Sequence, residues 1–347
     1  MIPKRINIAC TLLFWSLVVT AQPAGYYNTA EGLSGLELKQ ALHDIIDNHN
    51  VSTYSDLWTH FQSTDMKTDG SVWDIYSTVT YQFITDQCGD YNSEGDCYNR
   101  EHSFPKSWFG GEITPMYTDL FHLYPTDGFV NGKRGNLPYG ETLNPTWTSS
   151  NGSRLGVSSV PGYSGEIFEP IDEYKGDLAR TYFYMAVRYY GEDSGWPGSD
   201  MVAGAEPEPW ALDMLIRWNT DDPVSQKETD RNEAVYDIQG NRNPFIDNDG
   251  YVSSIWGVNS YSRAYSEEEA LRIYPNPASG IITINLPREI ESELIIKILT
   301  LQGVTVWSAK YEPGLPVRID LTSLARGTYL LVAESKESAL WQKIILY

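Results

Sequence analysis

The sequence changes character near residue 260, and the two parts differ in the pattern of their apolar residues. Before this point tyrosine and tryptophan are frequent, and polar loops separate the apolar stretches. After it, short segments alternate apolar and polar residues, which is typical of half-buried strands. The 347 residues are enough for two domains. We therefore expect a first domain over residues 22–258, a polar linker over 259–272 and a second domain over 273–347.

The first 21 residues are typical of a signal peptide. Lys4 and Arg5 precede an apolar run from Ile6 to Val19, and the small residue Ala21 follows at a position that suits a signal peptidase. The alternative is a membrane anchor, but a spanning helix requires about 20 apolar residues and this run is shorter. We therefore predict export and cleavage after Ala21.

Cleavage would leave two cysteines, Cys88 and Cys97, in the exported protein. An even number of cysteines in an oxidising compartment favours a disulfide. A bridge over so short a loop stabilises a fold by about 2–4 kcal/mol. Two free thiols are the alternative, and metal ligation by cysteines at this spacing is less favoured. The predicted bridge lies just before the residues with the strongest chemical pattern.

The chain is acidic, with 25 Lys/Arg against 46 Asp/Glu and a formal net charge of −21. The excess of acid lies before residue 273, because residues 273–347 hold seven basic and seven acidic side chains. The overall field would therefore not attract a polyanion. Residues 98–136 hold four basic and four acidic side chains and form a neutral segment within the acidic domain. Any nucleic-acid substrate must be held by local contacts of this kind.

Residues 273–347 predict a small β-sandwich of six or seven short strands. LRIYPNPASGIITINLP alternates Ile282, Ile284 and Leu286 with polar residues, and LIIKILTLQGVTVWSA, VRIDLTSLARGTYLLVAES and WQKIILY supply the other strands. An accessory sandwich that binds carbohydrate is the alternative, but this segment offers only Trp307 and Trp341 as stacking tryptophans.

This segment also contains three motifs, YPNPASG, DLTSLARGTYLL and KIILY. Together they resemble the C-terminal sorting domain of proteins that the type IX secretion system exports. The resemblance implies passage through the outer membrane, with the type IX machinery as a partner and the sorting domain commonly removed at the end. We expect a secreted or cell-surface protein, and no obligate protein partner is evident.

The chemistry of the first domain centres on Glu101 and His102. Within about thirty residues, YTDLFHLYPTDGFVNGKRGN adds further carboxylates, a histidine and the amide of Asn131. Mg²⁺ prefers oxygen ligands and keeps several waters, so Glu101 and Asn131 suit it. His102 suits a general base for an attacking water if a backbone carbonyl orients its far nitrogen. The pattern predicts metal-assisted hydrolysis of a phosphodiester.

The spacing of these residues limits how they can meet. Adjacent residues on a strand face opposite ways, so Glu101 and His102 serve one site only if the chain twists or turns there. We expect a loop after a short strand, because Pro105 soon ends any regular element. The 29 residues from His102 to Asn131 leave room for a hairpin return and the start of a helix.

Four blocks carry a resemblance to a known family: NREHSFPKSWF, TDLFHLYPTDGFVNGKRGNLPYG, FEPIDEYKGDLARTYFYMAVRYY and QGNRNPFID. In this order they resemble the endonuclease I family, whose members carry a His-Me (ββα-metal) finger. The resemblance implies an α+β nuclease domain and metal-dependent, largely nonspecific cleavage of DNA and often RNA. It implies one Mg²⁺, Mn²⁺ or Ca²⁺ ion per site, His102 as the general base, and Glu101 and Asn131 as metal ligands.

The phosphate-binding arginine of such nucleases has no clear counterpart, because Lys106 is the only basic residue between Ser103 and Met116. We expect Arg134, Arg100 or Arg180 to steady the transition state. Further substrate contacts are predicted at Lys106, Lys133, Asn241 and Arg242. The chain also departs from the family at Phe121-His122, where two histidines or His-Asn are common, and at Asn248-Asp249, where His-Pro is common.

Several of these residues also have a purely structural interpretation. His122 lies among apolar residues and is more typical of a hydrogen-bonded core histidine than of a ligand. Leu178, Tyr182, Met185 and Tyr189 recur at helical spacing and predict a helix with one face in the core. Arg180 lies off that face, where it can contact phosphate or pair with an acid such as Asp177. Asp247 to Gly250 predicts a turn, because the glutamate of a calcium loop is absent at the required distance.

Three functions remain open on the sequence. The first is a secreted metal-dependent endonuclease. The second is a catalytically weak or inactive surface protein that keeps the nuclease fold and binds nucleic acid, as the unplaced arginine and the acidic charge would allow. The third is a glycosidase with paired carboxylates, which the acidic and aromatic composition would allow. Dependence on a divalent metal separates the first from the third.

Overall fold

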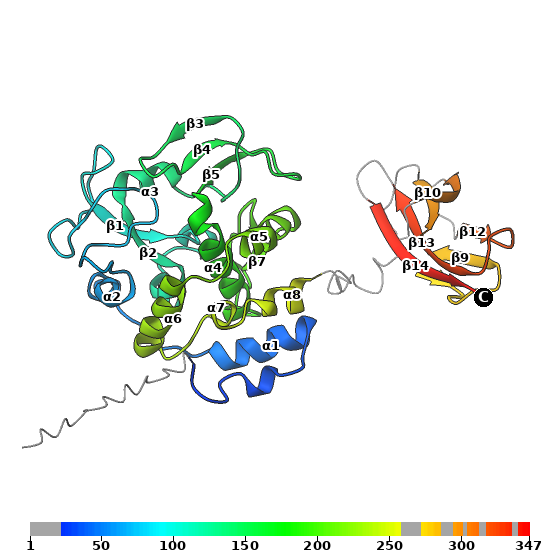
Figure 1. Cartoon of the computed structure of the whole chain (residues 1–347), viewed down its shortest axis with the longest axis horizontal. Coiled ribbons are helices and arrows are strands. Elements are labelled where there is room, and N and C mark those ends of the chain that lie inside the picture. Colours follow the sequence, from blue (N-terminus) through cyan, green and yellow to red (C-terminus); the bar gives the residue numbers. More distant parts are fainter. Residues whose placement is uncertain (1–21, 258–271, 286–293, 301–303, 312–316, 335–338) are drawn as a thin grey trace, which may run out of the picture. The chain divides into compact units, whose positions relative to one another are not determined.

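A computed structural model of the chain describes residues 22–257, 272–285, 294–300, 304–311, 317–334 and 339–347. The chain forms two compact units that divide near residue 260 (Figure 1). The predicted signal peptide, residues 1–21, and almost all of the predicted linker, 259–272, lie outside the described residues. Within the described ranges, no helix combines the length and the apolar character that a membrane span needs.

The first unit is mixed α and β, as predicted. Its α-helices are α1 (Gly35–Ile46), α2 (Leu57–Thr64), α3 (Gly128–Arg134), α4 (Lys175–Arg188), α5 (Pro209–Asp221), α6 (Gln226–Gln239), α7 (Pro244–Asp247) and α8 (Gly250–Trp256). Its 3₁₀ helices are η1 (Asn28–Ala30), η2 (Lys106–Phe109), η3 (Met116–Thr118), η4 (Leu120–His122) and η5 (Asp172–Tyr174).

The strands of the first unit form small antiparallel sheets. They are β1 (Tyr98–His102) with β2 (Leu123–Asp127), β3 (Pro145–Thr148) with β4 (Arg154–Val157) and β5 (Glu166–Glu169), and β6 (Val202–Ala203) with β7 (Glu206–Pro207). Since these sheets are short, the helices supply most of the core of this unit.

Helix α4 lies at the centre of the first unit (Figure 1). The predicted apolar face is in the core, but every residue from Gly176 to Arg188 is buried, including those off that face. Helices α1, α5 and α7 all contact α4, so it has no solvent-facing side. The prediction of a helix with one buried face was therefore incomplete, because the periodicity does not reveal how many neighbours a helix has.

The predicted hairpin and helix form one unit, β1–β2–α3. Strands β1 and β2 pair from Tyr98 opposite Asp127 to His102 opposite Leu123. Asp127 then begins α3, since its carboxylate accepts a hydrogen bond from the backbone N–H of Val130. We call β1, β2 and α3 the finger.

The predicted disulfide between Cys88 and Cys97 is confirmed, and it closes a loop just before β1. Tyr91 of this loop packs against α3 at Gly128 and Gly132. A Cβ atom at either glycine would come within 2.6 Å of the Tyr91 side chain. Because Gly128 and Gly132 have no side chains, Tyr91 of the disulfide loop can pack closely against the helix that carries Asn131.

The second unit is the predicted β-sandwich. Its strands are β8 (Arg272–Tyr274), β9 (Ile281–Asn285), β10 (Leu294–Thr300), β11 (Thr305–Tyr311), β12 (Val317–Asp320), β13 (Gly327–Glu334) and β14 (Ala339–Leu346). They form two sheets, in the orders β11-β10-β13-β14 and β12-β9-β8. Both sheets contribute to one apolar core, which contains Ile282 and Ile284 as the alternation predicts.

Candidate active site

One face of the finger brings together the two predicted metal ligands. Asn99 and Glu101 point to the same side of β1, because they are two residues apart on a strand. Helix α3 contacts this side. Asn131 donates a hydrogen bond from Nδ2 to Oδ1 of Asn99 over 2.7 Å, and Arg134 donates from Nη1 to Oε1 of Glu101 over 3.0 Å. Glu101 and Asn131 therefore line the same gap between β1 and α3.

Glu101 is held by one of its two carboxylate oxygens. The Tyr76 hydroxyl donates to Oε1 over 2.9 Å, beside the bond from Arg134. Within the described part of the chain, no hydrogen bond to Oε2 is found. The side chain is only 2% exposed, and this burial raises the pKa of Glu101, although Arg134 and the Tyr76 hydroxyl oppose the shift. Oε2 is therefore the oxygen that can ligate an ion.

These residues fit a hard divalent cation. Asn131 uses Nδ2 for its bond to Asn99, which leaves its amide oxygen Oδ1 as an acceptor. Oδ1 of Asn131 and Oε2 of Glu101 are then two oxygen ligands of the kind that Mg²⁺ prefers. Asn131 is only half-buried, so water can complete the coordination sphere.

Arg134 cannot contact phosphate in this structure. Its side chain is fully buried between α3 and the end of β1. Besides its bond to Glu101, it donates to the carbonyls of His102 over 2.9 Å and Ser103 over 2.8 Å, and its guanidinium lies 4.5 Å from the ring centre of Tyr139. The predicted transition-state arginine is thus placed as a positioning residue, which fixes Glu101 and the end of β1 at once.

His102 lies on the opposite face of β1 from Glu101. Strand β1 continues through both residues and ends at His102, so the expected loop follows the strand and does not bring the two side chains to one face. The ring stacks on Tyr117 with centroids 5.3 Å apart, and its Nε2 lies 3.0 Å from the Tyr117 carbonyl oxygen. A carbonyl only accepts, so Nε2 carries the proton and Nδ1 carries the lone pair. No partner for Nδ1 is found among the described residues.

The environment keeps His102 uncharged. It is 9% exposed, and burial lowers its pKa to about 3, with the charges of His122, Lys106 and Arg100 adding to the shift while the bond to the Tyr117 carbonyl opposes it. A neutral imidazole with a fixed tautomer and a free Nδ1 is the form that a general base requires. A backbone carbonyl was expected to orient the far nitrogen of His102, and in the structure this carbonyl belongs to Tyr117.

Two cations lie on the His102 side of the finger. Arg100 is two residues before His102, and its guanidinium lies 3.6 Å from the ring centre of Tyr54 and donates to the Tyr54 carbonyl over 2.7 Å. Lys106 lies over the Tyr117 ring, with Nζ 5.3 Å from the ring centre, and is exposed. Lys133 is also exposed, near the end of α3. These three, unlike Arg134, can be reached by a substrate.

The other predicted substrate contacts are buried and paired. Arg180 donates to Glu228 over 2.8 Å, and Arg242 forms ion pairs with Glu233 and Asp247. Both guanidinium groups join helices within the core and have no exposed side. Arg180 therefore has the acid-paired role that the sequence left open, although its partner is Glu228 more than Asp177.

Asn241 and His122 also belong to the core. Asn241 donates to the carbonyl of Ile46 over 3.1 Å and to the hydroxyl of Tyr184 over 2.8 Å. His122 is fully buried, with Nε2 2.6 Å from the carbonyl of Met116. His122 is thus a hydrogen-bonded core histidine, as its apolar neighbours indicate.

Four residues that shape the site were not predicted from the sequence: Asn99, Tyr54, Tyr76 and Tyr117. The alternation of a strand could have identified Asn99, since it lies two residues before Glu101. The tyrosines come from other segments, and no local pattern distinguishes them from the many tyrosines of the domain.

Comparison with known proteins gives a family match for each of the two units. A sequence model of the endonuclease I family matches residues 34–250, and a model of the secretion system C-terminal sorting domain matches residues 272–347. The chain is similar to an extracellular ribonuclease of Bacillus amyloliquefaciens, with 39% identity over 70% of the chain and 82% of that protein.

Two further relatives show the range of similarity. An extracellular ribonuclease of Bacillus subtilis is 36% identical over 70% of the chain and 84% of its own length. An extracellular deoxyribonuclease of Aeromonas hydrophila is 25% identical over 39% of the chain and 51% of its own length. The likeness to the Bacillus proteins spans most of each of them, whereas the likeness to the Aeromonas protein is confined to about half.

Proposed function

We propose that this member of the endonuclease I family is a metal-dependent endonuclease that cleaves DNA and RNA without sequence preference. The chain is a nuclease with a C-terminal sorting domain for secretion. The observation that carries the proposal is the finger, in which Glu101 and Asn131 share one gap and His102 has its Nε2 tied to a carbonyl. Its location is the cell surface or the medium.

The proposed chemistry divides the work between the two faces of β1. A bound Mg²⁺, with Glu101 and Asn131 as ligands, would polarise the phosphoryl group and offset the charge that builds on the leaving oxygen. Nδ1 of His102 accepts the proton of the attacking water, and the Tyr117 carbonyl keeps the ring in the required orientation. The scissile phosphate is expected at the end of β1, where Glu101 and His102 are adjacent in the chain.

Individual basic side chains near the site, and not the net charge of the protein, are proposed to bind the phosphates. Arg100 and Lys106 lie on the His102 side and Lys133 lies in the last turn of α3, so these three are the proposed phosphate contacts. They act within an acidic protein, and nonspecific binding to a polyanion falls steeply with salt. We therefore expect weak binding of nucleic acid without metal.

RNA is the substrate that the relatives favour. The two Bacillus relatives named as ribonucleases match the chain over more than four fifths of their length, whereas the Aeromonas deoxyribonuclease described above matches over about half of its length. Digestion of single- and double-stranded RNA and DNA, with Mg²⁺ and with chelator, tests the proposal. We expect cleavage of both polymers with Mg²⁺, none with chelator, and RNA cleaved at least as fast as DNA.

A matched pair of variants completes this test. Glu101→Gln should lose Mg²⁺-dependent cleavage, while Glu37→Gln, which changes an exposed acid of α1 outside the finger, should keep it. Undiminished cleavage in chelator would disprove the metal-dependent mechanism. If the protein binds nucleic acid but does not cleave it with any of several metals, the inactive surface protein is favoured instead. The burial of Arg134 is the observation that supports this alternative.

The acid limb of the pH profile should report Glu101 and not His102. Burial raises the pKa of Glu101, whereas it lowers that of His102 to about 3. As the pH falls, Glu101 therefore protonates first and loses its affinity for the ion, while His102 stays neutral. At low Mg²⁺, kcat/KM should fall at a pH above the ordinary glutamate range, and more Mg²⁺ should move this limb to lower pH. An acid limb near the ordinary pKa of histidine, about 6.5, would contradict this assignment if its position did not change with the Mg²⁺ concentration.

A further inference from the structure

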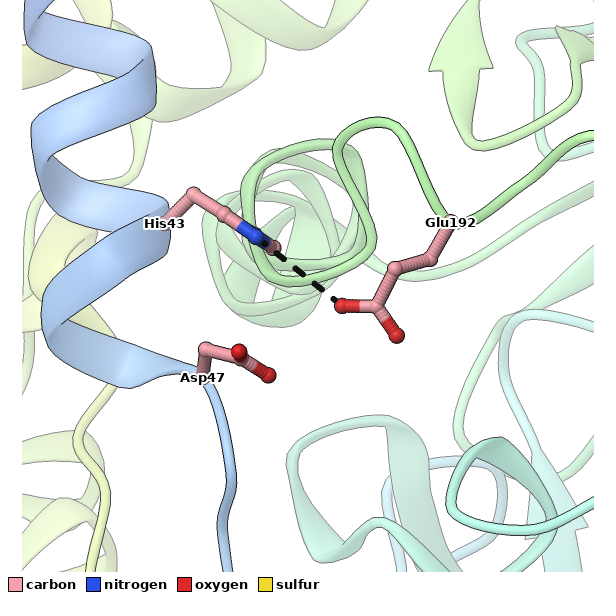
Figure 2. Close-up of side chains that lie close together, drawn as sticks. All are labelled: His43, Asp47 and Glu192. Carbon is pink, nitrogen blue, oxygen red and sulfur yellow. Dashed lines mark ion pairs between the residues drawn. The ribbon is translucent and has the colours of Figure 1, made fainter.

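A second group of metal-ligating side chains lies away from the finger, where α1 and α4 end. His43 is in the last turn of α1, and Asp47 follows that helix one turn later on the same side. Glu192 comes from the turn after α4. One ligand atom from each of the three lies within 4.8 Å of the others. Figure 2 shows the three side chains pointing toward one another from these separate segments.

His43 is oriented as a metal ligand would be. Its Nδ1 lies 3.0 Å from the carbonyl of Val187 and 3.1 Å from that of Arg188, both in the last turn of α4. Carbonyls only accept, so Nδ1 carries the proton and the lone pair of Nε2 points toward Glu192 (Figure 2). Histidines that bind metals usually donate their other ring N–H to a carbonyl or carboxylate in this way.

The gap between His43 and Glu192 suits an ion better than a direct bond. Nε2 and Oε1 are 4.0 Å apart, which is too long for a hydrogen bond. Two ligand atoms at Zn²⁺ bond lengths in a tetrahedral site lie about 3.3–3.5 Å apart. A movement of less than about 1 Å therefore brings both atoms to ligand distance. Since the His43 side chain is 12% exposed and that of Glu192 is 41% exposed, an ion can enter from solvent.

Arg188 shares the cluster and limits its affinity. Its Nη1 lies 3.2 Å from Oδ1 of Asp47 and 2.8 Å from Oε1 of Glu192. Asn48 also donates to both oxygens of Asp47. A carboxylate offers about four lone-pair sites, so Oε1 of Glu192, which lies 4.0 Å from Nε2 of His43, and the oxygens of Asp47 still have lone pairs for an ion. The two carboxylates and Arg188 leave one net negative charge, so a divalent cation is attracted, but less than by two unpaired carboxylates.

We propose that His43, Asp47 and Glu192 bind a divalent transition metal, with Zn²⁺ as the best fit, at a site independent of the finger. One imidazole nitrogen and two carboxylate oxygens suit Zn²⁺, whereas Ca²⁺ and Mg²⁺ prefer oxygen alone. The ion ties the end of α1 to the turn after α4. It therefore stabilises the fold of the first unit and takes no part in hydrolysis.

The experiment measures Zn²⁺ binding to the full chain with the Glu101→Gln substitution, which weakens the finger site. Titration calorimetry should give one ion per chain, and the unfolding midpoint should rise until one equivalent is bound. Co²⁺ in place of Zn²⁺ should give the visible absorption of a site with one nitrogen and several oxygen ligands.

Glu192→Gln should weaken binding at least about tenfold, as losing a ligand costs no less than losing a supporting hydrogen bond to one. Glu192 is exposed, so this variant is expected to fold, and circular dichroism checks that it does. Asp44→Asn is the matched control, because Asp44 is an exposed acid of α1 that bonds to Gln40 and lies outside the cluster. Equal Zn²⁺ affinity in Glu192→Gln and Asp44→Asn, or no binding to the folded chain, overturns the proposal.

Discussion

Replacing His102 with alanine should lower kcat for phosphodiester hydrolysis by about 10²- to 10⁴-fold, the usual contribution of a general base. The reason is geometric, because Nδ1 is the free nitrogen of a ring that Tyr117 holds through Nε2. The affinity for Mg²⁺ should change little, since Glu101 and Asn131 lie on the other face of β1. Single-turnover rates and Mg²⁺ titrations measure the two effects separately.

Two controls identify the loss as one of base catalysis. Added imidazole should restore part of the rate to the His102→Ala variant, because the cavity left by the ring opens beside the substrate. His60→Ala should leave the rate unchanged, since His60 lies in α2 and pairs with the Ser52 hydroxyl. If His102→Ala keeps more than about a tenth of the wild-type kcat, His102 is not the base.

Replacing Arg134 with methionine should lower the free energy of unfolding by about 3–5 kcal/mol, the cost of breaking a buried ion pair from one side. The change leaves Glu101 buried with Tyr76 as its remaining partner, and it frees the carbonyls of His102 and Ser103. Urea unfolding followed by circular dichroism gives the difference. The neighbouring change Lys133→Met is the control, and it should stay within about 0.5 kcal/mol because Lys133 is exposed.

Arg134 should also affect the site in a way that a merely structural residue would not. Without its bond, Glu101 is free to turn, so the apparent affinity for Mg²⁺ should fall in variants that remain folded. A double-mutant cycle with Glu101→Gln should show coupling of about 0.5–3 kcal/mol, because the two side chains share one hydrogen bond. If the effects of Arg134→Met and Glu101→Gln are additive, or if Arg134→Met leaves the Mg²⁺ affinity unchanged, Arg134 does not position Glu101.

Much of the finger could be read from local sequence. The distance from His102 to Asn131 predicts room for a hairpin return and the start of a helix, and the structure contains both. The requirement that a carbonyl orient the histidine was also predictable, although its source, Tyr117, was not. Local patterns were informative here because strand and helix geometry depends on neighbours in the chain.

The roles of the arginines could not be predicted in this way. Arg180 and Arg242 are polar residues beside apolar patterns, and solvent or phosphate is the default neighbour for such a charge. The structure instead buries both against carboxylates, and Glu228 is 48 residues from Arg180 in sequence. Burial of a charge depends on whether a distant acid reaches it, and no local periodicity contains that information.

The sequence by itself determined the division near residue 260, the disulfide pair and the family. The division and the disulfide pair follow from composition and from the cysteine count, whereas the family follows from the resemblance of four sequence blocks. Only the tertiary structure decided that His102 and Glu101 leave opposite faces of one strand and that Arg134 supports Glu101 instead of contacting phosphate. The physical reason is that a side chain's function depends on what surrounds it, and α3, Tyr76 and Tyr117 reach β1 only when the chain has folded.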